Sequence, residues 1–147
     1  MNSGMLMPLT AGFNHVASLT PDLDRFEAWY QEVFGAVTTF EMAADGDHPR
    51  MATVDVGGGS FLNVFEVPPE SIVGDRRSIG ARGAIDHFGF AVADLEALES
   101  LRSRLVGVGA DVHEIQRLGS EWSLFFRDVD GMELEVCAPA DELGGQR

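Results

Sequence analysis

The chain consists of two similar halves, and this repeat is the feature that most limits how it can fold. Each half begins with a short apolar segment that contains a histidine, His15 or His87, and runs into a segment that opens on Asp-Leu and an acidic residue. The two histidines lie 72 positions apart, and the same interval relates Asn63 to Glu135. The repeat predicts two modules of the same architecture, with these four polar residues at related places.

The hydrophobic pattern changes in the same order in each half. Alternating or β-branched segments predict strands, and apolar residues at helical spacing predict one helix in each half. We expect the strands at 13–19, 36–42, 51–56, 61–67, 84–91, 110–116, 121–127 and 132–138 and the helices at 21–35 and 94–106.

This order predicts an α+β fold of two tandem βαβββ modules, at about 12–67 and 84–139, within a single domain that covers 1–147. The linker at 68–83 has prolines, glycines and arginines and no hydrophobic period. Two such modules can curl their sheets toward each other. The expected architecture is therefore an incomplete eight-stranded barrel-like cleft with the helices outside.

Charge and cysteine content exclude several classes of function. The net charge of −14 argues against binding to nucleic acid or to anionic membranes, because such binding needs basic residues. Cys137 is the single cysteine, so the chain cannot form an internal disulfide or a cysteine-based zinc site. The segment 1–10 resembles neither a signal peptide nor a membrane span. We expect a cytoplasmic protein that acts on a small molecule.

His15, His87 and Glu135 together form a candidate metal site. Glu135 shares one face of its strand with Glu133 and Cys137, because side chains alternate along a strand. Two imidazoles and a carboxylate suit Zn, Fe, Mn, Ni or Co and leave coordination positions open. The alternative is structural: a histidine on an apolar strand is more often a hydrogen-bonded core residue, and the glutamates are then simply solvated.

Three short motifs resemble the vicinal oxygen chelate superfamily over about residues 12–139. This superfamily includes glyoxalase I, methylmalonyl-CoA epimerase, fosfomycin-resistance thiol transferases, extradiol dioxygenases and bleomycin-resistance proteins. The motifs are His15-Val-Ala with Asp22-Leu-Asp, His87-Phe-Gly-Phe with Asp94-Leu-Glu, and Asp128-Val-Asp-Gly-Met-Glu-Leu-Glu135-Val. The resemblance implies that His15, His87 and Glu135 bind one divalent metal, which chelates two adjacent substrate oxygens. It also implies a homodimer, in which ligands from both chains sometimes complete each site.

Departures from individual members leave the reaction open. Glyoxalase I and the epimerase carry Glu or Gln where this chain has Asn63, and an asparagine cannot act as a base. The tyrosine of the extradiol dioxygenases has no counterpart here, because Tyr30 lies on the buried face of a predicted helix. Phe125 could stack on a substrate ring. Arg127 could neutralise an anionic substrate, or it could simply pair with a neighbouring aspartate on the surface.

Two functions therefore compete. In the first, the chain is a metal-dependent enzyme of the glyoxalase or dioxygenase type, in which the metal acts as a Lewis acid and Glu135 also moves a proton. In the second, it is a metal-free protein of the bleomycin-resistance kind that sequesters a cationic aromatic compound. A degenerate member, in which the histidines and the glutamate are only structural, is a third possibility. The substrate, the reaction type and the metal stay open.

Overall fold

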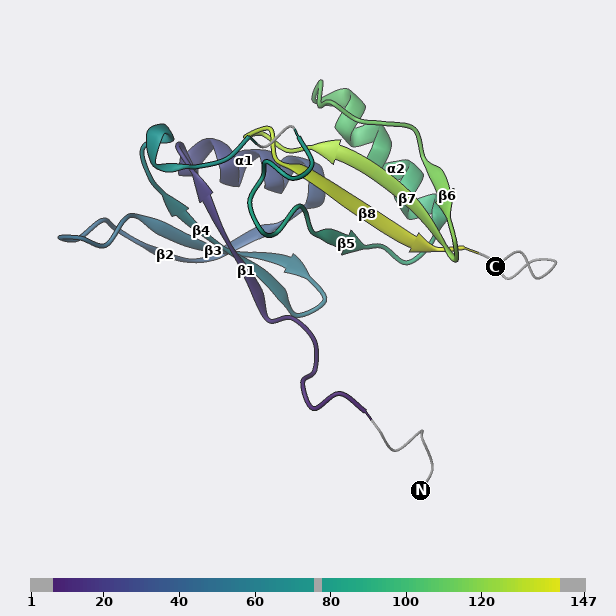
Figure 1. The fold of residues 1–147 in the computed structure, drawn as a ribbon, viewed down its shortest axis with the longest axis horizontal. Helices are drawn as coiled ribbons and strands as arrows, with labels where there is room; N and C mark the ends of the chain where they lie inside the picture. Colours follow the sequence, from purple (N-terminus) through teal and green to yellow (C-terminus); the bar gives the residue numbers. More distant parts are fainter. Residues whose placement is uncertain (1–6, 76–77, 141–147) are drawn as a thin grey trace.

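The computed structural model describes residues 7–75 and 78–140, and these form two four-stranded sheets with two long helices (Figure 1). The first module contains β1 (His15–Thr20), α1 (Leu23–Phe34), β2 (Val37–Met42), β3 (Met51–Gly57) and β4 (Ser60–Glu66). A short 3-10 turn, η2 (Pro69–Ser71), follows in the linker. The second module contains β5 (Gly89–Ala91), α2 (Leu95–Gly107), β6 (Gln116–Leu118), β7 (Glu121–Arg127) and β8 (Glu133–Pro139). The predicted α+β fold of two βαβββ modules is confirmed.

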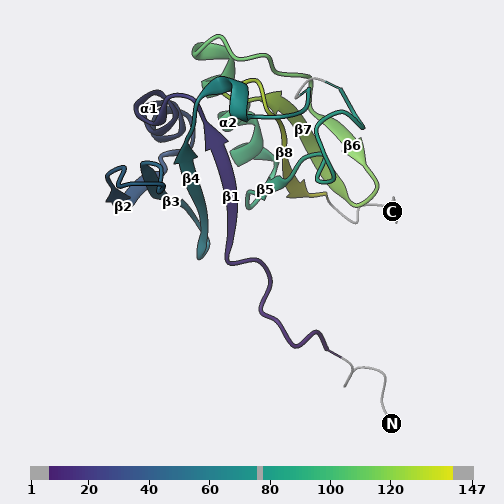
Figure 2. The same cartoon turned by 60° about the vertical axis from the view of Figure 1, so that its left-hand side comes forward.

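Both sheets have the same strand order, which is the structural form of the sequence repeat. The first sheet runs β1-β4-β3-β2 and the second runs β5-β8-β7-β6. In each sheet the first strand pairs parallel with the last strand of its module, and the other pairs are antiparallel. The two sheets stay open rather than closing into a barrel, with β1 and β5 at their neighbouring edges (Figure 2).

Two strands are shorter than the sequence predicts. β5 covers 89–91 instead of 84–91, and β6 covers 116–118, so that it shares only residue 116 with the predicted strand at 110–116. Immediately before β5, the Glu135 amide still donates a hydrogen bond to the Phe88 carbonyl at 3.2 Å. The residues before Phe88 are instead held by ion pairs of Asp86 with Arg82 and His87. The tail at 141–147, which we expected to be frayed, lies outside the described residues.

Aspartate caps begin both helices. Asp22 accepts a hydrogen bond from the Arg25 amide at 3.1 Å, and Asp94 accepts one from the Ala97 amide at 2.9 Å. These bonds satisfy amides that lack a partner within the helix. Gly35 ends α1 in the left-handed region, with φ of 69°, where other residues are strained. The buried helical residues are Leu23, Phe26, Tyr30, Val33, Leu98, Leu101 and Leu105.

The two modules share one hydrophobic core, which forms where the helices meet the inner faces of both sheets. α1 packs on its own sheet and also reaches the second, where Trp29 stacks on Phe126 with ring centroids 6.4 Å apart. Phe34 contacts Phe90 at 5.0 Å. Arg104 of α2 donates a hydrogen bond to the Val33 carbonyl at 3.1 Å. Neither helix of the described segments is long and apolar enough to cross a membrane.

The opposite faces of the sheets point away from this core, and we call them the outer faces. His15 and Asn63 lie on the outer face of the first sheet, because β1 and β4 pair in a register that sets Ala17 beside Asn63. Phe125 and Glu135 lie on the outer face of the second sheet, where they are direct cross-strand partners. The candidate site residues are therefore divided between two faces.

A second hydrogen bond between the modules involves a buried carboxyl group. The Tyr30 hydroxyl donates to Asp128 at 2.7 Å, and Asp128 also accepts from the amides of Asp130 and Met132. We expect Tyr30→Phe to lower the free energy of unfolding by about 2 kcal/mol, because it removes one hydrogen bond to a buried carboxyl group. Urea unfolding of the two proteins measures this difference, and an unchanged midpoint would contradict it.

The same carboxyl group should produce a pH-dependent difference in stability. Burial raises the pKa of Asp128 above its usual range, against the hydrogen bonds from Tyr30, Met132 and Asp130. The folded state then binds this proton more tightly than the unfolded state, so the Asp128 contribution to stability improves as the pH falls toward the unfolded pKa. Asp128→Asn cannot titrate. The stability of this variant relative to the natural chain should therefore decrease from pH 7.5 to pH 4.5, and a difference constant over that range would refute the assignment.

Candidate metal and substrate site

His87 and Glu135 meet on the outer face of the second sheet. β8 aims Glu135 outward, and His87 lies two residues before β5, which pairs with β8 through Gly89 and Glu135. His87 Nε2 lies 3.1 Å from Glu135 Oε1. Two of the three ligands predicted from the sequence are therefore brought together, 48 residues apart along the chain.

Glu135 is held as an ionised carboxylate by its neighbours. Burial opposes ionisation, but hydrogen bonding with Ser123, His87 and Cys137 lowers the pKa of Glu135. Ser123 donates to Oε2, the oxygen that His87 does not contact. The sequence analysis missed Ser123, although strand alternation places it on the same face as Phe125 and would have identified it.

The other nitrogen of His87 faces a second carboxylate. His87 Nδ1 lies 2.8 Å from Asp86 Oδ2, and the same oxygen lies 2.6 Å from Arg82 Nη1. The hydrogen bond from His87 and the charge of Arg82 hold the pKa of Asp86 below its usual range. The bond to Asp86, followed by the contacts with Glu135, raises the pKa of His87 against the effect of burial. The Arg82–Asp86 pair was not predicted from the sequence, because opposite charges at i and i+4 indicate an ion pair only within a helix.

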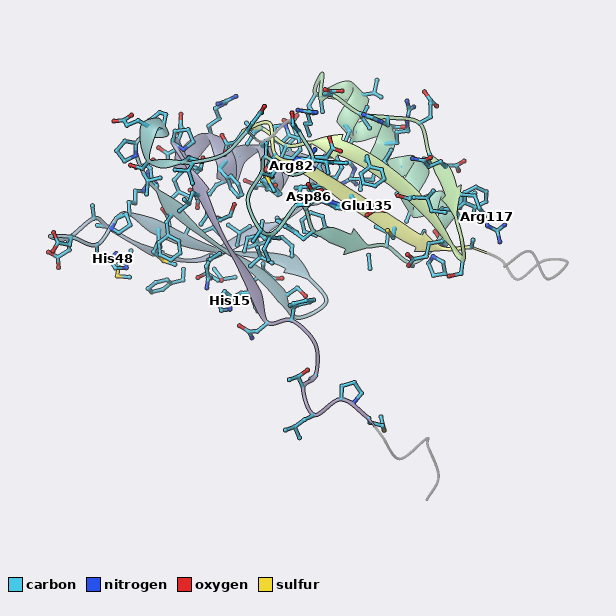
Figure 3. All side chains as sticks on the ribbon, in the orientation of Figure 1. His15, His48, Arg82, Asp86, Arg117 and Glu135 are labelled. Atoms are coloured by element: carbon cyan, nitrogen blue, oxygen red, sulfur yellow. The ribbon has the colours of Figure 1, made fainter. Side chains whose placement is uncertain are left out.

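His15 lies on the first sheet, away from the other two candidate ligands. Figure 3 shows its side chain at the start of β1, whereas Glu135 projects from the second sheet. His15 Nδ1 pairs with Asn14 Oδ1 at 2.9 Å. Across residues 7–75 and 78–140 of one chain, no group of three or more His, Cys, Asp or Glu side chains is placed to bind a metal ion. A single chain thus presents an imidazole on one sheet and an imidazole with a carboxylate on the other.

Asn63 accompanies His15 rather than Glu135. It accepts a hydrogen bond from the Thr53 hydroxyl at 3.1 Å across the β3-β4 pair. The outer face around it is largely apolar. Four of its hydrophobic side chains are more than a third exposed, namely Leu19, Val37, Phe40 and Met42.

Phe125 and Arg127 lie on the same face as Glu135. The Phe125 ring meets the His87 imidazole edge to face, with centroids 5.5 Å apart. Arg127 is the cross-strand partner of Glu133, and its guanidinium lies 3.4 Å from Glu133 and 3.4 Å from Asp111. The aspartates expected as its surface partners, at 128 and 130, are not the groups in these two ion pairs.

A cavity of about 1020 Å³ lies elsewhere, between α1, the segment 108–111 and the turn at 128–131. Trp29, Glu32 and Arg127 are among its lining residues, but none of the three candidate ligands reaches it. The space around His87 and Glu135 is instead an open sheet surface.

Comparison with known proteins identifies the family. The model of the Glyoxalase/Bleomycin resistance protein/Dioxygenase superfamily matches residues 12–136. The chain belongs to this superfamily. The match covers both modules and includes His15, His87 and Glu135. No curated protein sequence matches the chain closely enough to count as a relative.

Solved structures share the superfamily fold. A glyoxylase/bleomycin resistance protein/dioxygenase domain from Frankia sp. EAN1pec is 28% identical, with a TM-score of 0.76 over 88% of this chain and 98% of that one. Lactoylglutathione lyase from Agrobacterium tumefaciens is 25% identical, with a TM-score of 0.65 over 94% and 99%. A mutant of the fosfomycin resistance protein FosX from Listeria monocytogenes, solved with Mn(II) and 1S,2S-dihydroxypropylphosphonic acid, is 18% identical, with a TM-score of 0.65 over 91% and 94%.

The environment of Cys137 gives a measurable test of the charge at Glu135. Burial, followed by the carboxylates of Glu135 and Glu121, raises the pKa of this thiol to about 12. Because the thiolate is the reactive form, iodoacetamide at pH 8 should label the folded protein at least about 100-fold more slowly than the urea-unfolded chain. Glu135→Gln should speed labelling of the folded protein. An equal rate in the variant would show that Glu135 does not act on the thiol.

Proposed function

We propose that the chain is a divalent-metal enzyme of the glyoxalase or dioxygenase type, whose site is completed between two copies. His15 of one protomer joins His87 and Glu135 of the other. The observation that carries this proposal is the division of the ligands: His87 and Glu135 meet at 3.1 Å on one outer face, while His15 occupies the other. Each chain then supplies complementary halves of two sites.

The outer faces support a homodimer as the complete unit. The face with His15 exposes Leu19, Val37, Phe40 and Met42, an apolar surface that a monomer would leave in water. In a twofold dimer, the first sheet of one copy would cover the second sheet of its partner, and the reverse contact would form at the same time. This arrangement would produce the barrel-like cleft that the sequence predicts, with strands from both chains.

The residues fit a divalent metal. Two imidazoles and one carboxylate form a ligand set for Zn, Fe, Mn, Ni or Co with positions left for water or substrate. His87 also has the environment typical of metal-ligating histidines, because its second ring nitrogen binds a carboxylate at 2.8 Å. The Mn(II) complex of FosX makes Mn(II) a reasonable first metal to test on this fold.

A divalent ion held by these residues would act as a Lewis acid toward two adjacent oxygens of a small substrate. Glu135, kept ionised by its hydrogen bonds, would accept a proton from the substrate and return it. Asn63 cannot act as a base, and we assign this transfer to Glu135. Phe125 provides an apolar wall beside His87, and Arg127 would neutralise an anionic substrate group near Glu133.

The competing function is binding without chemistry. The net charge of −14 and the Phe125 ring beside Glu135 would suit a cationic aromatic compound, as in a bleomycin-resistance protein. Metal analysis of protein purified without added metal separates the two functions. We expect one divalent ion per chain and loss of activity with a chelator in a panel of ring-cleavage, epimerase and glutathione-dependent lyase assays. A metal-free protein indifferent to the chelator would favour binding alone.

Mixed dimers test whether the site is shared. His15→Ala and His87→Ala should each abolish metal binding in homodimers. A heterodimer of the two variants can be purified with two different tags. One of its two shared sites keeps all three ligands, because the H87A chain supplies His15 and the H15A chain supplies His87 and Glu135. It should therefore bind one metal ion per dimer, measured by a Mn(II) or Zn(II) titration.

A site formed within one chain predicts no metal in this heterodimer, since each chain then lacks a ligand. A second heterodimer provides the control. One chain carries both His15→Ala and His87→Ala and the other is unsubstituted, so every shared site lacks one ligand. The shared-site proposal predicts no tight binding here, whereas a site within one chain would survive in the unsubstituted chain.

A further inference from the structure

A row of alternating charges crosses the outer face of the second sheet and begins in the linker. Arg82 Nη1 lies 2.6 Å from Asp86, and Arg82 Nη2 lies 3.6 Å from Glu133. The Arg82 side chain is 2% exposed, although it comes from a segment without regular structure. An arginine buried to this degree, with two carboxylates as partners, is a built element of the fold rather than a solvated linker residue.

The linker loop fixes the place of Arg82. The Asp75 amide donates to the Ala81 carbonyl at 2.7 Å, which closes the loop immediately before Arg82. Gly74 makes this closure possible, because it has φ of +95° and a Cβ there would lie 2.8 Å from the Ala81 oxygen. The loop thus delivers the guanidinium to Asp86 from a fixed backbone position.

We propose that Arg82 and Asp86 are positioning residues that hold the His87 ring with its Nε2 atom available to a metal. The expected effect on metal binding rests on the proposed function. The contacts among Arg82, Asp86 and His87, however, all lie within one chain. Arg82 holds the Asp86 carboxylate, Asp86 binds His87 Nδ1 at 2.8 Å, and Nε2 is thereby aimed at Glu135.

The proposed role follows from a competition for one proton. A neutral imidazole carries a single N–H, and His87 has a carboxylate at each nitrogen, with Asp86 at 2.8 Å and Glu135 at 3.1 Å. A proton on Nδ1 leaves the Nε2 lone pair for a metal, whereas a proton on Nε2 blocks it. Asp86 selects the first tautomer. Without Asp86, Glu135 would hold the proton on Nε2.

Two measurements on the unsubstituted chain and its variants test this role. The ¹⁵N shifts of the His87 ring, recorded without metal at alkaline pH, report which nitrogen carries the proton. A Zn(II) titration against a competing chelator reports affinity, with His87→Ala identifying the site. Asp86→Ala should move the proton to Nε2 and weaken Zn(II) binding about 10–100-fold. Asp86→Asn, whose amide oxygen can still accept from Nδ1, should recover part of both properties.

Arg82→Gln should give a smaller loss of affinity, because Asp86 remains but is no longer held. This loss should disappear in the Asp86→Ala background if Arg82 acts through Asp86. Arg102→Gln is the control, because Arg102 pairs with the Glu114 carboxylate at 2.9 Å, away from the candidate site. It should leave the tautomer unchanged and the affinity within about 2-fold, since it has no contact with the ligands.

The outcomes separate this inference from the proposed function. If the natural chain binds Zn(II) through His87 and Asp86→Ala changes neither tautomer nor affinity, the positioning role is wrong and the metal site stands. If the natural chain binds no metal, the proposed function fails, and the tautomer of His87 alone tests the positioning role of Asp86. A shift of the proton to Nε2 in Asp86→Ala then supports the positioning role, and an unchanged ring overturns it.

Discussion

The contact between the two modules through their helices determines what the rest of the molecule can do. Trp29 and Phe34 of α1 pack on Phe126 and Phe90 of the second sheet, so the inner faces of both sheets are used to build one core. The outer faces are then turned away from each other. A chain that buries its helices in this way cannot also close its own two sheets around a ligand, and this places the candidate ligands on separate surfaces.

The sequence predicted the modules well because both the repeat and the alternation along each strand are visible in the order of the residues. The interval that relates His15 to His87 also fixed which strands correspond, and alternation placed Glu135 on one face of its strand with Glu133 and Cys137. The packing of one module on the other was not predictable, because an apolar helix stripe is compatible with either arrangement. The Arg82 contact was missed for a similar reason: its loop depends on backbone bonds around Gly74 that leave no periodic signal.

Charge on the second sheet distinguishes two glutamates that the sequence could not separate. Glu133 and Glu135 share a face, but Glu133 lies within 3.6 Å of Arg82 and within 3.4 Å of Arg127. Glu135 instead receives a hydrogen bond from Ser123 and lies 3.1 Å from His87 Nε2. A carboxylate between two guanidinium groups is poorly suited to bind a cation, because the cation would have to displace or tolerate both positive charges. Glu135 is therefore the better ligand of the two.

The division of the site also separates metal binding from the choice of reaction. Under the proposed dimer, the paired ligands and their hydrogen bonds come from the second sheet, whereas Asn63 comes from the first sheet of the other copy. A substitution on the first sheet can then change the groups that face the substrate without disturbing the bonds of His87 and Glu135. The side chain of Asn63 is an amide, which cannot accept a proton as a base. At the proposed site, Asn63 would therefore supply no base to the reaction.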